Sequence, residues 1–191
     1  MQGKPIATNR QAAGIPTGKL AIWWLLASEI VIFGGVLAAY IMHRIGHVEF
    51  GGYAAHTNVV AGAINTFVLL TSSLCAVLAH QAAEQGDGKK AAKLLWMTIG
   101  GGALFLVIKS AEWTYEITHG LTLQSNPFWH FYYVAAGVHA SHVIAGMVAM
   151  VFVAFRAKKN EELQRVELVG IYWHFVDIVW IFLFPLLYIA K

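Results

Sequence analysis

Residues 170–189 read GIYWHFVDIVWIFLFPLLYI, a nearly unbroken apolar run with two titratable side chains near its start. A helix of about 20 apolar residues is long enough to cross the hydrocarbon core of a bilayer. His174 and Asp177 are three residues apart, so they lie on one face of such a helix. A carboxyl group facing lipid would be costly, so we expect this face to meet protein, lipid headgroups or water. The same face also carries Gly170, Trp173, Trp180, Ile181 and Phe184.

The composition of the whole chain agrees with a membrane location. Of its 191 residues 58% are hydrophobic and only 12% are charged, whereas a soluble domain carries about 25% charged residues. Apolar runs cover residues 20–42, 59–80, 93–115, 128–155 and 169–190, and the segments between them are short. The sequence therefore predicts an all-α integral membrane bundle of five transmembrane helices, forming a single membrane domain over residues 1–191.

The basic residues predict how this bundle is oriented. Most of the 13 Lys and Arg residues precede the first span or lie in the second and fourth loops: Lys4, Arg10, Lys19, Lys89, Lys90, Lys93, Arg156, Lys158, Lys159 and Arg165. The opposite side holds Arg44 and Lys191, and Lys109 lies within a span. Because cytoplasmic loops are enriched in Lys and Arg, we expect a cytoplasmic N-terminus and an external C-terminus.

Two classes of function are disfavoured by the composition. The positive charges flank apolar spans and form no basic face, so the net charge of +3 does not indicate nucleic-acid binding. The single cysteine, Cys75, lies inside the second apolar run and rules out a cysteine-rich iron–sulfur or dinuclear copper centre within the chain.

Charged side chains within the spans are candidates for function. Glu29 lies in the first span, either as a carboxylic acid that hydrogen-bonds a neighbouring helix or as a group that positions protons or contacts a partner subunit. Lys109 and Glu112 are three residues apart and oppositely charged, which predicts an ion pair within one helix. Glu116 follows on the same face.

A second set of candidates joins the last two spans. His139 and His142 have the same three-residue spacing as His174 and Asp177. Histidines and carboxylates on adjacent helices build metal sites in helix bundles, so a stand-alone membrane metalloenzyme is one interpretation. Hydrogen bonds between helices, or contacts with lipid, explain the same four residues without a metal.

Five stretches, in order along the chain and covering all five spans, resemble subunit III of the haem–copper terminal oxidases. They are WWLLASEIVIFGG (23–35), INTFVLLTSS (64–73), AEWTYE (111–116), GVHASHVIAG (137–146) and YWHFVDIVWIFLF (172–184). The chain resembles the short five-helix form of this family, which lacks the two additional N-terminal helices of the seven-helix form.

The resemblance implies an accessory subunit of a proton-pumping cytochrome c or quinol oxidase in the plasma (inner) membrane of a bacterium. In that family subunit III has no catalytic centre and binds no haem or copper, which belong to the partner catalytic subunit. It packs on subunit I, holds phospholipid, and supports proton uptake and the durability of the active site. Subunit II and a small subunit IV are further expected partners.

The resemblance also assigns the candidate residues. Glu29 falls on the family's membrane-embedded glutamate, and His139, His142, His174 and Asp177 fall on polar positions of its last two helices. A homologous subunit that accompanies a nitric oxide reductase remains an alternative, and the sequence does not identify the electron donor.

Overall fold

The computed structural model describes residues 11–12, 15–46, 50–54 and 57–190. Within these residues five helices are long and apolar enough to cross a membrane, which confirms the expected helical bundle. They are α2 (Thr17–Gly46), α4 (Val59–Glu84), α5 (Gly88–Thr118), α6 (Pro127–Ala157) and α7 (Gln164–Phe184), the last of which continues into the π-helix η1 (Pro185–Ile189). Most of these helices extend several residues beyond the apolar runs, because their polar end turns remain helical.

Three short elements were not expected from the sequence. The strands β1 (Gln11–Ala12) and β2 (Ile15–Pro16) pair antiparallel just before α2. The helix α3 (Phe50–Ala54) lies in the connection between α2 and α4. Elements of two to five residues leave no periodic pattern in a sequence, so hydrophobic periodicity does not reveal them.

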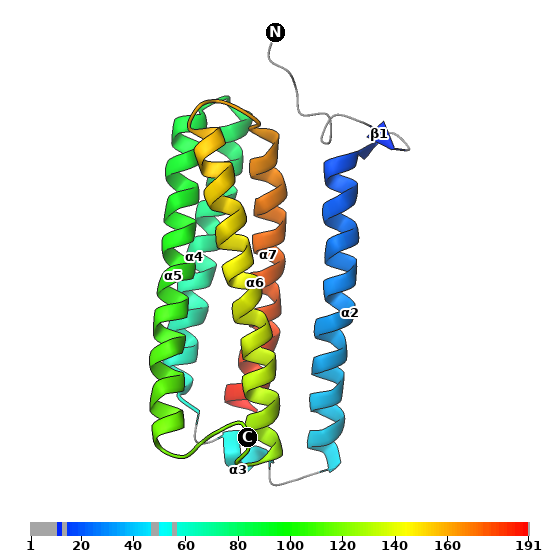
Figure 1. Cartoon of the computed structure of the whole chain (residues 1–191), viewed down its shortest axis with the longest axis vertical. Coiled ribbons are helices and arrows are strands. Elements are labelled where there is room, and N and C mark those ends of the chain that lie inside the picture. Colours follow the sequence, from blue (N-terminus) through cyan, green and yellow to red (C-terminus); the bar gives the residue numbers. More distant parts are fainter. Residues whose placement is uncertain (1–10, 13–14, 47–49, 55–56, 191) are drawn as a thin grey trace.

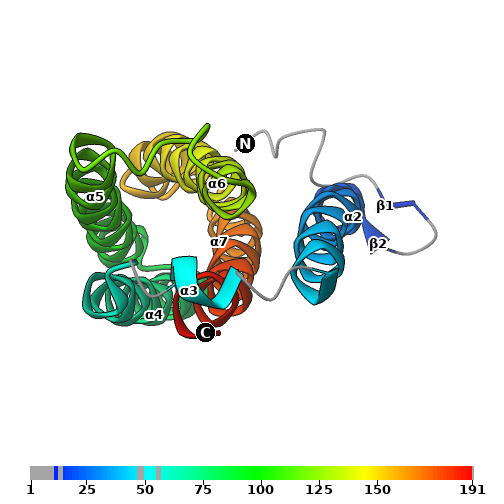
Figure 2. The ribbon, with the colours of Figure 1, turned by 90° about the horizontal axis from the view of Figure 1, so that it is seen from below.

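Helices α4 to α7 form a four-helix bundle, and α2 stands beside it next to α7 and α6 (Figures 1 and 2). Small residues let α4 and α5 approach closely. Gly101 of α5 faces Ser72 of α4, where an added Cβ would lie 2.6 Å from the serine Cβ. The neighbouring buried positions are also small: Ala76, Ala79 and Ala83 on α4, and Ala91 and Ala92 on α5.

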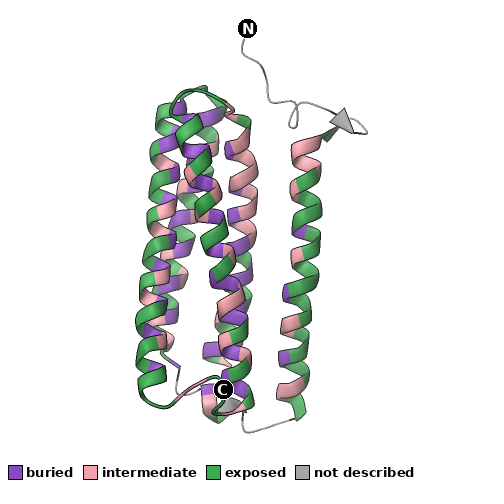
Figure 3. Ribbon diagram, viewed as in Figure 1, coloured by how far each residue is buried: buried purple, intermediate pink, exposed green. Residues whose placement is uncertain are grey.

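Helix α2 is attached by a narrow seam. Its buried residues are Leu26, Phe33 and Tyr40, which follow one another at seven-residue intervals along one side of the helix. Most other residues of α2 are exposed, as Figure 3 shows, and Trp23 and Trp24 are 61% and 73% exposed. The rest of α2 is therefore available to lipid or to another protein.

The loops at one end of the bundle are fastened to each other. Asp87 caps α5 by accepting a hydrogen bond from the Lys90 backbone N–H at 2.9 Å. The Gly88 N–H donates to Asn160 Oδ1, also at 2.9 Å, in the loop between α6 and α7. Asn160 has a φ of 56°, a left-handed conformation that asparagine tolerates better than most residues.

The face of α7 that carries His174 and Asp177 is mostly covered by the chain itself. Trp173 Nε1 donates to Ser72 Oγ and Trp180 Nε1 to Thr66 Oγ1, each at 3.0 Å, so both indoles bind α4. The expectation that this face meets protein is confirmed for its centre. Ile181, at the edge of the face, is 42% exposed, so the chain by itself does not cover it.

Candidate functional site

Glu29 and His142 join α2 to α6. Glu29 Oε2 lies 2.9 Å from His142 Nε2, and the two side chains are only 12% and 18% exposed. The other ring nitrogen, Nδ1, lies 2.8 Å from the Val138 carbonyl oxygen, which only accepts hydrogen bonds. Nδ1 therefore carries a hydrogen, and Nε2 is the atom that faces the carboxyl group. A single polar contact thus holds the middle of a helix that has few other attachments.

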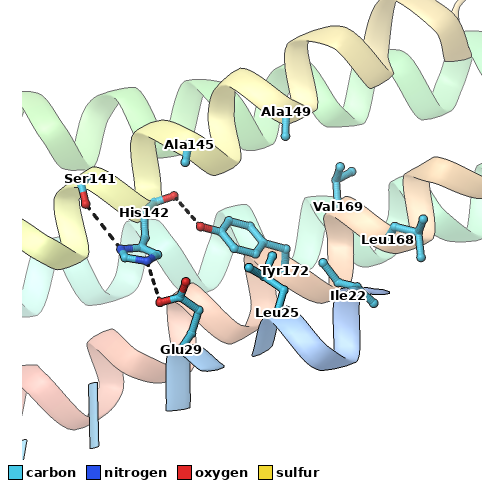
Figure 4. A pocket seen from close by; sticks show the side chains of 10 residues that line it. All are labelled: Ile22, Leu25, Glu29, Ser141, His142, Ala145, Ala149, Leu168, Val169 and Tyr172. Carbon is cyan, nitrogen blue, oxygen red and sulfur yellow. Dashed lines mark hydrogen bonds and ion pairs between the residues drawn. The ribbon is translucent and has the colours of Figure 1, made fainter. Parts of the chain in front are cut away.

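A cavity of about 480 Å³ opens beside this pair, between α2, α6 and α7 (Figure 4). Its polar lining consists of Glu29, Ser141, His142 and Tyr172, which lie close together in Figure 4. Its apolar lining consists of Ile22, Leu25, Ala145, Ala149, Leu168 and Val169. An apolar cavity with a few convergent polar groups is the usual form of a small-molecule site.

A second polar cluster lies in the core of the bundle, near the ends of α5 and α7 and the start of α6. Lys109 is 1% exposed, and its Nζ donates to Glu112 Oε2 at 3.0 Å and to the Tyr132 hydroxyl at 2.7 Å. It also donates to the Tyr188 hydroxyl. The ion pair predicted from the three-residue spacing is therefore present, and two tyrosines complete its hydrogen bonding.

Glu116 belongs to the same cluster. It is 2% exposed, and its Oε1 accepts a hydrogen bond from the Tyr132 hydroxyl at 2.9 Å. Lys109 Nζ also lies 4.4 Å from the centre of the Tyr132 ring, within the range of a cation–π contact. Because Tyr188 comes from η1, the cluster ties α5, α6 and the end of the chain together.

The remaining predicted residues have separate neighbours. His174 Nδ1 lies 2.6 Å from Ser73 Oγ on α4. Asp177 is 3% exposed, and neither of its carboxyl oxygens has a hydrogen-bond partner in the described part of the chain. His139 is fully buried against the rings of Phe105 and Trp180, at centroid distances of 5.5 and 5.2 Å.

These positions do not bring the His139–His142 pair and the His174–Asp177 pair together, as the metal-site interpretation would require. His142 turns toward Glu29 of α2, His139 packs among aromatic rings, and His174 binds α4. Among the described residues, no group of three or more His, Cys, Asp or Glu side chains is arranged to hold a metal ion. The three-residue spacing pairs His139 with His142 on α6 and His174 with Asp177 on α7. The two side chains of each pair nevertheless face different neighbours.

Four tyrosines were missed as site residues. Tyr132 and Tyr188 bind Lys109, Tyr172 lines the cavity, and Tyr40 Oη donates to the Leu186 carbonyl at 2.9 Å. Tyr132 and Lys109 lie on different helices, and residue spacing along the sequence does not predict contacts between helices. Tyr188 lies in the π-helix η1, where side chains point in directions that differ from those expected of an α-helix.

Comparison with known proteins identifies the family. The family model described as cytochrome c oxidase subunit III matches residues 7–191. Cytochrome c oxidase subunit 3 of Corynebacterium diphtheriae is 35% identical over 173 residues, which cover 87% of this chain and 84% of that protein. The corresponding subunit of Thermostichus vulcanus is 32% identical over 98% of this chain and 94% of its own length.

A further relative, the heme-copper oxidase subunit I+III of Aeropyrum pernix, is 33% identical over 89% of this chain and 22% of that protein. The match to the family extends over nearly the whole sequence and over all five long helices. The chain therefore belongs to the cytochrome c oxidase subunit III family and is a multi-pass membrane subunit of a haem–copper oxidase.

Proposed function

We propose that this chain is the non-redox subunit III of a proton-pumping terminal oxidase in a bacterial plasma membrane. It packs on the catalytic subunit I, which carries the haem and copper, and it adjoins subunit II and a small subunit IV. The name of the Aeropyrum pernix relative, subunit I+III, supports a direct association between subunits I and III. In this proposal the chain takes part in oxygen reduction only as an accessory to the catalytic subunit.

The observation that carries the proposal is the Glu29–His142 contact beside the cavity of α2, α6 and α7. The pair fixes α2 to the bundle, so that α2 presents a defined outer surface to the other subunits. The cavity holds lipid. By keeping α2 and its lipid in place, the chain supports proton uptake and prolongs the life of the catalytic site.

A second role for Glu29, proton exchange, is favoured by one detail. Only Oε2 of Glu29 contacts His142, and the side chain also lines the cavity. A carboxyl group held by a histidine on one side and open on the other is suited to exchanging a proton with a group in the cavity.

The proposed orientation places the N-terminal side of α2 in the cytoplasm and the C-terminus outside. The described basic residues that flank the spans support it. Lys19, Lys89, Lys93, Lys158 and Arg165 lie near the start of α2 or around the α4–α5 and α6–α7 connections, which are at one end of the bundle in Figure 1. Cytoplasmic loops are enriched in such residues. We regard residues 1–191 as one membrane domain.

The subunit assignment is tested by purifying a tagged form of this chain in mild detergent. We expect haem-containing oxidase subunits to co-purify and the complex to consume oxygen. Co-purification with a complex that reduces nitric oxide instead, or without haem proteins, would contradict the proposal.

Two variants of Glu29 then separate its roles within the purified complex. Glu29→Gln keeps the size and hydrogen bonding of the side chain but does not titrate, whereas Glu29→Ala removes the contact with His142. An anchoring role predicts loss of subunit III from the Glu29→Ala complex and normal turnover of Glu29→Gln. Proton exchange predicts that Glu29→Gln assembles normally but pumps poorly at high pH. Glu84→Gln, whose side chain is 67% exposed at the end of α4, is the control.

A further inference from the structure

We infer that the cavity between α2, α6 and α7 binds a neutral lipid whose small uncharged head, bearing a hydroxyl group, reaches Glu29. This inference rests on the proposed lipid-holding function and names the chemical class of the lipid. An isoprenoid hydroquinone and a monoacylglycerol both have this chemistry. A phospholipid does not, because its head is charged.

Glu29 presents a free hydrogen-bond acceptor to the cavity. His142 Nδ1 donates to the Val138 carbonyl at 2.8 Å, so the contact of 2.9 Å between Nε2 and Glu29 Oε2 holds one hydrogen between the two atoms. In the described part of the chain, Glu29 Oε1 has no protein hydrogen-bond partner. A ligand hydroxyl that donates to Oε1 would satisfy an acceptor that the protein leaves open.

Tyr172 provides a hydrogen-bond donor near this acceptor. The Tyr172 hydroxyl lines the same cavity and reaches the His142 carbonyl only at 3.4 Å, which is long for such a bond. It can donate instead to a second oxygen of the ligand. Glu29 and Tyr172 both contact His142 (Figure 4), so one small head can reach both.

The depth of Glu29 in the membrane also disfavours a phospholipid head. Ile22 and Glu29 both line the cavity, and Glu29 lies about two helical turns, roughly 10 Å, further along α2 toward the middle of the membrane. The head of a phospholipid stays at the membrane surface, so only its hydrocarbon chain would reach Glu29. Hydrocarbon beside Oε1 would leave this acceptor without a partner, whereas a hydroxyl-bearing head at that depth would provide one.

The charges around the cavity disfavour an anionic head. Among the described residues, the cavity lining includes no Lys or Arg side chain that could hold a phosphate. The nearest described cation at the start of α2, Lys19, lies 2.5 Å from Glu167 Oε1, so its charge already has a partner. The site therefore favours an uncharged head over an anionic one.

The experiment measures lipid binding to the purified, delipidated oxidase complex by mass spectrometry. The probes are a short-tailed hydroquinone, its dimethyl ether, a monoacylglycerol and phosphatidylglycerol, each added in detergent. We expect the hydroquinone, the monoacylglycerol or both to be retained, and the one retained more strongly identifies the source. The ether, which lacks the donor, should be retained about tenfold less than the hydroquinone.

Two variants localise the binding. Ala145→Leu fills the cavity and should reduce retention of the hydroxyl-bearing probe about tenfold, whereas Ala103→Leu, on an exposed face of α5, should not change it. Tyr172→Phe removes the donor but keeps the ring, and it should weaken retention by about fivefold. Failure to retain either hydroxyl-bearing probe would overturn the inference, and so would a retained hydroquinone that binds no more strongly than its ether. Preferential retention of phosphatidylglycerol, or no effect of Ala145→Leu, would also overturn it.

The outcome is distinguishable from a failure of the proposed function. If the complex assembles with its haem subunits and consumes oxygen but shows no hydroxyl-dependent retention, the inference alone is wrong. If the haem subunits do not co-purify with this chain, the proposed function is wrong.

Discussion

Replacing Lys109 with methionine tests the buried charge cluster. Methionine is close to lysine in length but carries no charge and donates no hydrogen bond. The substitution would leave Glu112, 7% exposed, and Glu116, 2% exposed, without their cation. It would also remove the hydrogen bonds that Nζ donates to Glu112, Tyr132 and Tyr188.

The expected loss in the free energy of unfolding is about 3–5 kcal/mol, the usual cost of removing one partner of a buried ion pair. Most of this cost comes from the carboxylates left behind. The double variant Lys109→Met/Glu112→Leu removes both members of the pair, so it should lose less stability than the single variant. Unfolding in mixed detergent micelles, followed by the fluorescence of the seven tryptophans, measures both free energies.

Lys89→Met, on an exposed position at the start of α5, provides the control and should change the free energy by about 0.5 kcal/mol or less. If Lys109→Met were as stable as this control, the cluster would not hold the bundle together. If the double variant were less stable than Lys109→Met alone, the assignment of the cost to unpaired carboxylates would be wrong.

Three other predictions follow from single contacts. Gly88→Ala should destabilise the chain, because the added Cβ would overlap the Ala157 carbonyl and Asn160. Gly100→Ala should not, because there is free space around Gly100. Thermal unfolding of the two variants tests this difference. His139→Phe should leave the free energy of unfolding unchanged or raise it by about 1 kcal/mol, because both ring nitrogens of His139 are buried without a hydrogen-bond partner in the described residues. A clear decrease in the free energy of unfolding would show that the imidazole has a polar role. A cysteine added at the C-terminus should react with an impermeant thiol reagent from outside the cell, and labelling only from the cytoplasm would reverse the proposed orientation.

The helices could be predicted from the sequence because a membrane-spanning helix must satisfy its own backbone hydrogen bonds and therefore needs a long apolar run. Local spacing was sufficient for contacts within one helix, and the Lys109–Glu112 pair has the predicted geometry. At the start of α6, which begins at Pro127, the Asn126 side chain accepts from the Trp129 backbone N–H at 3.1 Å.

Contacts between helices were less predictable. The sequence placed His139 and His142 on one stretch of helix, but not which neighbour each one faces. His139 turns into the bundle and His142 turns toward α2, because residues three apart are separated by about 60° around the helix axis. Tyr188, which binds Lys109, lies in η1, which begins at Pro185, and no sequence rule predicts a π-helix of five residues.

The way in which α2 is attached to the bundle explains both the Glu29–His142 contact and the cavity beside it. Between helices in a membrane the hydrophobic effect gives little driving force, so packing and polar contacts decide how firmly a helix is held. Among the described residues, the polar contacts of α2 include the Lys19–Glu167 ion pair, the Glu29–His142 contact and the bond from Tyr40 to the Leu186 carbonyl. The first two are separated by about 15 Å of helix, and the cavity lies in that interval. A helix that is held at separate points, with space between them, can admit a lipid without leaving the bundle. The polar contact at the inner end of this space is the Glu29–His142 contact, and it presents the free acceptor Glu29 Oε1 to the lipid.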